Sequence, residues 1–163
     1  MRLFRTVALG AVMACLAAGM AIVLVQSFWI TYGVFVRYAL GNPDGTVTEA
    51  TALLLVPLAF LGLPYALKED AFPRVTFVTD KLPRRIAILV GKIHLVIMVL
   101  LGLFFAAVTV NATITSFRSG ASSSVLGWPE YLFWGPVAIA SGAFVMYGVY
   151  QLFAGNPVQE SKE

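Results

Sequence analysis

The feature that most constrains this chain is a long segment without a single charge. No Asp, Glu, Lys or Arg occurs from Val7 to Val36. A helix of that length would measure roughly 45 Å, which exceeds the hydrocarbon thickness of a bilayer, about 30 Å. The segment therefore predicts a membrane-spanning helix that tilts strongly or extends into the interface.

Three further apolar stretches follow, Ala50–Leu67, about Ile93–Phe117, and Tyr131–Ala154. Each is long enough to span a bilayer, the first of them barely. Continuous apolar runs are typical of helices, because a helix satisfies its own backbone hydrogen bonds in lipid. We therefore predict an all-α integral membrane protein, with residues 1–163 forming a single four-helix membrane domain and helices at about 7–38, 49–67, 86–117 and 129–154.

Two prolines fall within the second of these predicted helices, at Pro57 and Pro64. Proline removes one backbone donor and its ring clashes with the preceding turn of a helix. The pair predicts a kink or a broken final turn in this helix.

The N-terminus also has the outline of a secretory signal peptide. It combines a basic start, an apolar centre and several small residues. A signal peptide would give way to a polar mature chain, whereas here the apolar run continues to Val36. We therefore expect the segment to be retained as the first helix.

Composition supports a membrane protein. The chain is 60% hydrophobic and 12% charged, outside the range of soluble globular domains. The single cysteine, Cys15, excludes an intramolecular disulfide and a cysteine-rich metal site. The net charge of +3 is better explained by membrane orientation than by nucleic-acid binding, so no nucleic-acid partner is expected.

Basic residues are distributed unequally between the predicted loops. Nine of the eleven lie before the first helix, between the second and third, at the start of the third, or after the fourth. Only Arg37 and Arg118 lie on the other side. The positive-inside rule then predicts a bacterial inner-membrane protein with cytoplasmic N- and C-termini. The residues expected to set orientation and anchoring are Arg2, Arg5, Lys81, Arg84, Arg85 and Lys92.

The loop between the second and third helices carries apolar residues at helical spacing: Phe72, Val75, Val78 and Leu82. With basic residues elsewhere around the wheel, this pattern favours a short amphipathic helix lying in the interface at about 72–82. The alternation of Val75, Phe77 and Thr79 equally fits a strand fragment. Anchoring alone would account for this segment.

No charged residue lies in the interior of a predicted span, and charged residues there usually mark ion or substrate pathways. The deep polar residues Gln26 and Asn111 are better suited to hydrogen bonds between helices. His94 has no partner at metal-ligand spacing and is expected to be solvated at the interface. We therefore predict no catalytic, cofactor-binding or metal-binding residues, which argues against an enzyme or a stand-alone pump.

Small residues recur at four-residue spacing on two predicted helices: Gly10, Ala14 and Ala18 on the first, and Ala138 and Gly142 on the fourth. Small residues let helix backbones approach closely in a membrane. These stripes are suited either to packing within the four-helix unit or to docking onto another membrane protein.

Several short motifs follow one another along the chain. Val-Phe-Val-Arg-Tyr ends at Tyr38, a Gly-Asn-Pro turn follows, and Glu49 opens the second helix. Phe-Leu-Gly-Leu-Pro-Tyr-Ala-Leu-Lys-Glu-Asp, Asp-Lys-Leu-Pro-Arg-Arg and Leu-Gly-Trp-Pro-Glu-Tyr come later, the last from Leu126. In their order and spacing these motifs resemble the small membrane subunit of tripartite ATP-independent periplasmic (TRAP) transporters over most of the chain.

Two positions depart from that family's pattern. The entry to the second helix reads Thr-Val-Thr-Glu-Ala, without the family's tryptophan and second acid. Ala-Phe-Pro-Arg-Val-Thr stands where the family has a histidine in the inner loop.

The resemblance implies an accessory role. Such subunits pair with a large multi-span subunit that moves substrate by a sodium-driven elevator motion. A periplasmic binding protein delivers an organic acid such as a dicarboxylate, a keto acid or a sialic acid. The small subunit would be a non-catalytic brace, without cofactors. The alternatives are an independent homo-oligomeric membrane protein or channel, an uncharacterised enzyme, or a four-helix subunit of a tricarboxylate uptake system.

Arg37 and Glu49 are opposite charges on either side of one predicted outer turn. An exposed pair of this kind contributes at most about 1 kcal/mol. Both could instead snorkel at the interface or meet charged groups of the large subunit or of the binding protein. The candidate partner-interface residues are Arg37, Glu49, Arg118, Trp128 and Tyr131. The two aromatic residues also fit an interfacial belt.

Overall fold

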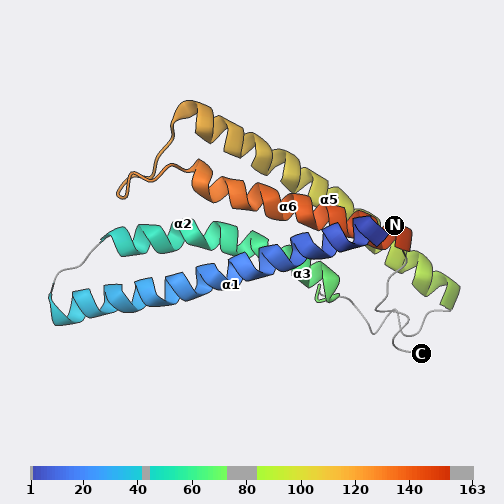
Figure 1. Cartoon of the computed structure of the whole chain (residues 1–163), viewed down its shortest axis with the longest axis horizontal. Helices are drawn as coiled ribbons and strands as arrows, with labels where there is room; N and C mark the ends of the chain where they lie inside the picture. The colour runs from blue at the N-terminus through green and yellow to red at the C-terminus, as the bar shows by residue number, and fades with distance from the viewer. Residues whose placement is uncertain (1, 42–44, 73–83, 155–163) are drawn as a thin grey trace.

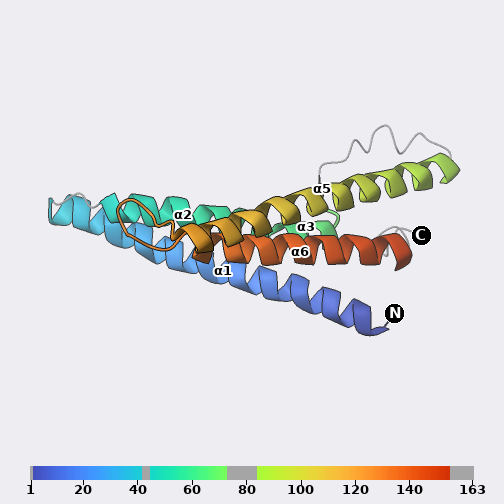
Figure 2. The ribbon, with the colours of Figure 1, turned by 90° about the horizontal axis from the view of Figure 1, so that it is seen from above.

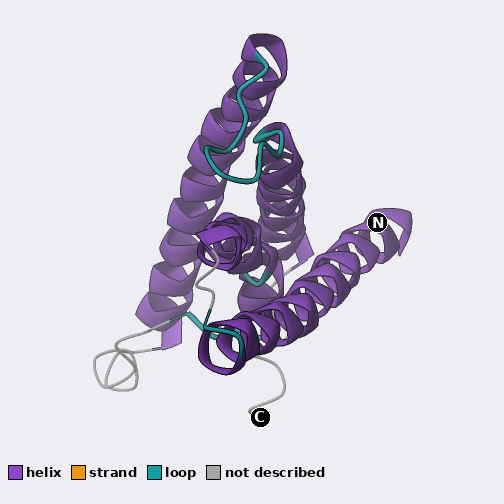
Figure 3. Cartoon of the chain, turned by 90° about the vertical axis from the view of Figure 1, so that its left-hand side faces the viewer, coloured by secondary structure: helices purple, strands orange, loops and turns teal. Residues whose placement is uncertain are grey.

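The computed structural model describes residues 2–41, 45–72 and 84–154. Within these ranges the chain is helical and contains no strand (Figure 3). The helices are α1 (Arg2–Ala39), α2 (Gly45–Leu61), α3 (Leu63–Lys68), α5 (Arg84–Ser119) and α6 (Tyr131–Ala154). Among the described residues, four segments are long and apolar enough to cross a membrane. The predicted all-α membrane architecture is thereby confirmed, with ends that differ by a few residues from those predicted.

The four spans form two hairpins in an elongated bundle (Figure 1). One end carries the turn between α1 and α2 and the loop between α5 and α6, and is called the hairpin end. The N-terminus and the end of α6 lie at the opposite, terminal end (Figure 2). The interfacial helix predicted at 72–82 lies outside the described residues apart from Phe72, and so does Lys81.

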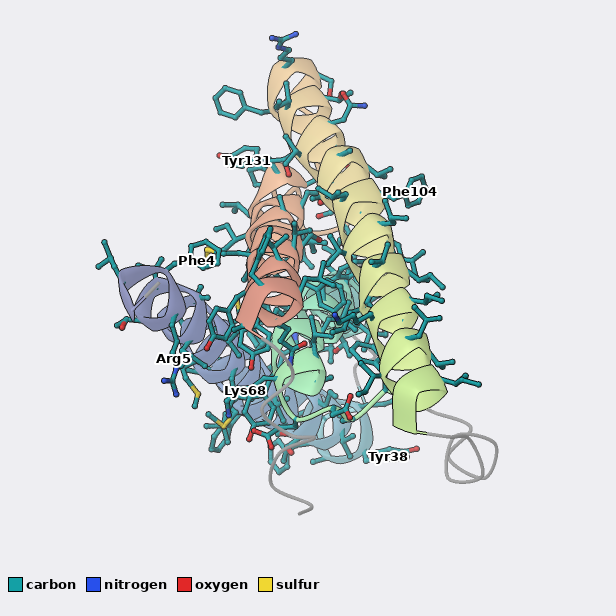
Figure 4. All side chains as sticks on the ribbon, turned by 90° about the vertical axis from the view of Figure 1, so that its right-hand side faces the viewer. Phe4, Arg5, Tyr38, Lys68, Phe104 and Tyr131 are labelled. Carbon is teal, nitrogen blue, oxygen red and sulfur yellow. The ribbon has the colours of Figure 1, made fainter. Side chains whose placement is uncertain are left out.

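Helix α6 is the centre of the bundle. It packs against α1, α2, α3 and α5, whereas α5 packs mainly against α6. Viewed from the terminal end, α6 lies between α1 and α5 (Figure 4). The buried residues along α6 include Val137, Ala140, Phe144 and Tyr147. Ala140, Phe144 and Tyr147 meet Ala8, Val12 and Cys15 of α1 and Leu61 and Leu67 of α2 and α3 in two apolar clusters.

Glycines allow the closest approaches between these helices. A Cβ atom at Gly148 of α6 would lie 2.8 Å from Cγ2 of Val99 on α5. One at Gly102 of α5 would lie 2.7 Å from Cδ1 of Phe144. These distances are shorter than van der Waals contact, so the α5–α6 interface depends on the missing side chains.

The small-residue stripes noted in the sequence lie elsewhere. Gly10 and Gly142 have open space where a Cβ would be, with nothing within 4 Å. Ala14 and Ala18 of α1 are exposed. Packing within the subunit therefore does not use these residues, and docking onto another protein is the alternative that stays a prediction.

The second apolar stretch is broken as its prolines predict. Helix α2 ends at Leu61, and Gly62 separates it from α3, where Pro64 lies in the first turn. Pro57 is accommodated within α2. Helix α3 ends in a Schellman motif, in which Asp70 adopts φ +56° and the Ala71 N–H donates to the Ala66 carbonyl.

Several polar side chains inside the spans make hydrogen bonds, whereas Trp29 Nε1 and Ser116 Oγ are buried without a partner among the described residues. Gln26 of α1 donates to the Thr51 carbonyl of α2 at 3.1 Å, which confirms the predicted bond between helices. Asn111, by contrast, is exposed on α5, and no bond to another helix is seen for it in the described residues. Several hydroxyls donate instead to carbonyls four residues earlier in their own helix: Ser27, Thr31, Thr51, Thr109, Thr113 and Ser141.

Candidate partner interface at the hairpin end

The loop that joins α5 to α6 is a small, well-connected hairpin. An antiparallel bridge pairs Ser122 with Pro129. Beyond it, the Ser123 N–H donates to the Trp128 carbonyl at 2.9 Å, and the Trp128 N–H donates to Ser123 Oγ at 3.1 Å. Ser123 thus closes the turn with both its backbone and its hydroxyl group, and residues 121–130 present a defined tip.

Two glycines permit this path. Gly120, directly after α5, has φ +64°, and Gly127, in the turn, has φ +65°. Such left-handed conformations cost little only for a residue without a Cβ. The sequence Leu-Gly-Trp-Pro from Leu126 therefore encodes the turn itself.

Glu49 holds the tip of this loop from α2. Its carboxylate accepts the Leu126 N–H at 2.7 Å from Oε2 and the Val125 N–H at 3.0 and 3.1 Å from its two oxygens. Hydrogen bonds to an ionised carboxylate are worth about 1.5–3 kcal/mol, more than neutral ones. Because α5 packs mainly against α6, this contact is a second tie between the two hairpins, and we call it the Glu49 clamp.

The clamp differs from the pairing considered from sequence. Arg37 lies in the last turn of α1 and is exposed. No ion pair between Arg37 and Glu49 is found among the described residues. Sequence reasoning identified the carboxylate and missed its partners, because these are backbone amides 76 and 77 positions away. An amide donor has no residue-type signature.

The predicted aromatic residues consolidate the same end of the molecule. The Trp128 ring stacks on Phe133 with centroids 6.2 Å apart. Tyr131 meets Phe117 of α5 edge to face at 5.4 Å. Arg118 is exposed in the last turn of α5. All five predicted interface residues thus lie at the hairpin end, although only Glu49, Trp128 and Tyr131 make the contacts described here. Their roles toward a partner stay predictions.

The terminal end carries the basic residues predicted to orient the chain. Arg2 and Arg5 lie in the first turns of α1, and Arg5 points away from the bundle (Figure 4). Arg84 and Arg85 open α5, and Lys92 is exposed two turns later.

One ion pair at this end involves neighbouring residues. Lys68 Nζ donates to Glu69 Oε1 at 2.6 Å and lies 4.9 Å from the centroid of the Tyr65 ring. The hydrogen bond from Lys68 lowers the pKa of the Glu69 carboxyl below its usual 4.5. The pair is largely solvated, so it contributes little to stability.

Among the residues that the structure describes, no cluster of His, Cys, Asp and Glu could hold a metal ion. Cys15 is buried in the apolar cluster formed with α6. At the hairpin end the structure instead shows packed helices and a loop, residues 121–130, that Glu49 holds by hydrogen bonds.

Comparison with known families agrees with this geometry. Residues 27–155 match the family described as tripartite ATP-independent periplasmic transporters, DctQ component. The match spans most of the chain and contains the Glu49 clamp. The chain belongs to this family. It is a small membrane component of a TRAP transporter, with several membrane-spanning helices. Comparison with curated proteins gives no match.

For a TRAP small subunit, the matched segment is informative. It begins within α1, ahead of Arg37, and ends just after α6. It therefore includes all five candidate interface residues, whereas Arg2, Arg5 and the stripe from Gly10 lie before it. The family match also sets aside the tricarboxylate-uptake alternative.

Proposed function

We propose that this TRAP small subunit is a non-catalytic brace for the large membrane subunit. In this proposal the large subunit carries out sodium-coupled uptake of an organic acid by an elevator motion. A periplasmic binding protein delivers the substrate. The family supports the proposal, since its members are components of tripartite transporters.

The observation that carries the proposal is an open face on the central helix. Gly135 and Gly142 of α6 have nothing within 4 Å of the position of a Cβ, and Ile139 between them is 69% exposed. Seven residues make two helical turns, so both glycines lie on one face. A helix of the large subunit could approach closely along this face, which the subunit's own packing leaves uncovered.

The interior of the spans supports a brace over a substrate pathway. Within the described helices, charged side chains lie toward the helix ends. In α5 no charged residue occurs between Lys92 and Arg118, and in α2 the charged residue is Glu49, in the first turns. The hydroxyl groups of Thr31, Thr109 and Ser141, which lie between these ends, bond to carbonyls of their own helices. Transporter sites are built instead from ionisable groups and broken helices near the membrane centre.

The charges suggest an orientation in the bacterial inner membrane. The terminal end carries Arg5 and Lys92 and would be cytoplasmic under the positive-inside rule. The hairpin end would face the periplasm, with Arg37 and Arg118 exposed on it. There the Glu49 clamp would hold the loop of residues 121–130 in a fixed position for the large subunit and, transiently, for the binding protein.

The test is co-purification of the tagged subunit with its large subunit from native membranes in mild detergent. We expect Gly142→Trp to abolish recovery of the large subunit, because the indole would block the face of α6. Gly10→Trp tests the other candidate stripe: Gly10 is also exposed with nothing within 4 Å but lies before the matched segment, so this variant should leave recovery unchanged if the interface is on α6.

Two results would overturn the proposal. One is recovery of the chain alone as a defined homo-oligomer, which would favour an independent channel. The other is normal substrate uptake by cells that lack this subunit but retain the large one. A complex that survives Gly142→Trp but not Gly10→Trp would move the interface from α6 to α1.

A further inference from the structure

A cavity of about 160 Å³ lies between α5, α6 and the α2–α3 segment. Phe60 of α2 and Leu63 of α3 line one wall, and Met98, Leu101 and Phe105 of α5 line the other. Phe144 of α6 contributes to the floor. The cavity exists because α5 packs on α6 and leaves a space beside α2 and α3.

The lining is entirely apolar. Ser141 borders the cavity, but its hydroxyl group donates to the Val137 carbonyl at 2.8 Å and is not offered to a ligand. Water in a buried site needs two to four polar partners, and apolar cavities of roughly 150 Å³ stay dry and bind hydrocarbons. The natural occupant is therefore apolar.

Aromatic pairs hold the walls in place. Phe60 and Phe105 meet edge to face across α2 and α5 at 5.5 Å, and Phe72 meets Phe144 in the same way at 6.0 Å. Gly102 lets α5 lie directly against Phe144. The space is thus bounded by contacts that do not require a ligand.

We propose that this cavity binds one acyl chain of an anionic phospholipid. Leu101 at its edge is 44% exposed, so the cavity is reachable from the hydrocarbon that surrounds a membrane-spanning α5. An empty space of this size forfeits the dispersion contacts of its lining, and a flexible acyl chain restores them.

Depth and charge identify the leaflet and the headgroup. Met98 of α5 lies six residues, roughly 9 Å, from Lys92, whereas Phe105 lies midway between Lys92 and Arg118. The cavity therefore extends from the leaflet at the terminal end toward the centre of the span. Arg84 and Arg85 open the same helix. Basic residues at the end of a site between helices favour an anionic headgroup.

The test uses phosphatidylglycerol with a photoreactive diazirine in the middle of one acyl chain. The full chain is placed in nanodiscs of phosphatidylethanolamine and phosphatidylglycerol, irradiated and analysed by peptide mass spectrometry. We expect labelling concentrated on Met98–Phe105 and on residues 60–63. Excess unlabelled phosphatidylglycerol should compete for it, and a phosphatidylcholine probe should label more weakly.

The variant Leu101→Trp fills the cavity and should reduce this labelling several-fold. Leu103→Trp is the matched control, because Leu103 is 50% exposed on the same helix and does not line the cavity. If Leu101→Trp does not fold, competition by unlabelled phosphatidylglycerol on the unaltered protein tests whether the cavity binds the lipid.

Three outcomes would overturn the inference. Labelling could spread evenly over the exposed surfaces of α1 and α5, or it could persist unchanged in a folded Leu101→Trp variant. Loss of the label in the purified complex with the large subunit would show that a partner side chain fills the cavity. None of these outcomes bears on whether the subunit braces the transporter.

Discussion

Helices α5 and α6 are consecutive along the chain and pack against each other, yet they have opposite environments. In the most apolar window of α6, 44% of the residues are buried, against 17% in that of α5. The window of α5 is nevertheless the more hydrophobic of the two. Phe104 shows the consequence, since it points away from the other helices (Figure 4) and is 61% exposed.

The difference teaches what hydropathy measures in a membrane protein. An apolar side chain is equally compatible with lipid and with a protein interior, so hydropathy reports the membrane and not the core. The buried helix is distinguished instead by small residues, such as Ala140, Ala143 and Gly148, which let four neighbours approach it.

The largest effect should come from removing the same aromatic residue from each helix. Phe144→Ala on α6, where Phe144 is 6% exposed, should lower the free energy of unfolding by about 2–4 kcal/mol. Phe104→Ala on α5 should change it by less than about 0.5 kcal/mol, because lipid replaces the lost contacts. Equilibrium unfolding of the isolated subunit in mixed micelles measures both. Equal losses would break the distinction between the two helices.

A second test compares two glycines on α6 itself. Gly148→Leu should destabilise the isolated subunit by about 1–3 kcal/mol, because Val99 of α5 occupies the space that the new side chain needs. Gly142→Leu should be neutral or stabilising by up to about 1 kcal/mol, since the space there is open and leucine favours helix. The same unfolding assay applies, and a loss in Gly142→Leu that matches Gly148→Leu would mean that the open face is packed.

The Glu49 clamp sharpens the comparison, because it ties the α5–α6 hairpin to α2 where α5 itself has little contact. Glu49→Gln keeps an acceptor oxygen but loses the charge, which should cost about 1 kcal/mol. Amide hydrogen exchange at Val125 and Leu126 should then become about fivefold faster. Arg37→Ala is the control and should leave exchange unchanged. Faster exchange at Val125 and Leu126 in Arg37→Ala would instead support the Arg37–Glu49 ion pair that was considered from the sequence.

The smallest effect concerns Glu69, at the terminal end of the other hairpin. Lys68 lowers the pKa of this carboxyl in the folded state, so its contribution to stability is present above the unfolded value of 4.5. That contribution is lost as the pH falls through the lowered pKa. Thermal unfolding at falling pH should therefore show a slight loss that Glu69→Gln removes. A large loss that persists in Glu69→Gln would point to another carboxyl group.

Sequence reasoning located the spans because their absence of charge leaves lipid as the only suitable environment. It also placed the break before Pro64 and the bond made by Gln26, since proline geometry and the cost of an unpaired amide in lipid act locally. Of the two roles that it left open for the small residues, packing within the subunit does not use Gly10 or Gly142, whereas Gly33, Gly102 and Gly148, which make close contacts, do not share their four-residue spacing.

By itself, then, the sequence determined that the described part of the chain contains four helices long and apolar enough to cross a membrane, with basic residues concentrated toward one end of the chain's predicted topology. Only the tertiary structure decided that α6 is the centre, that α5 borders a cavity, and that Glu49 holds the loop near Leu126. The physical reason is that a bilayer removes the contrast between inside and outside on which sequence periodicity depends. Which face of a helix is buried is therefore decided by how the side chains of neighbouring helices fit together, and this fit is visible only in the packed structure.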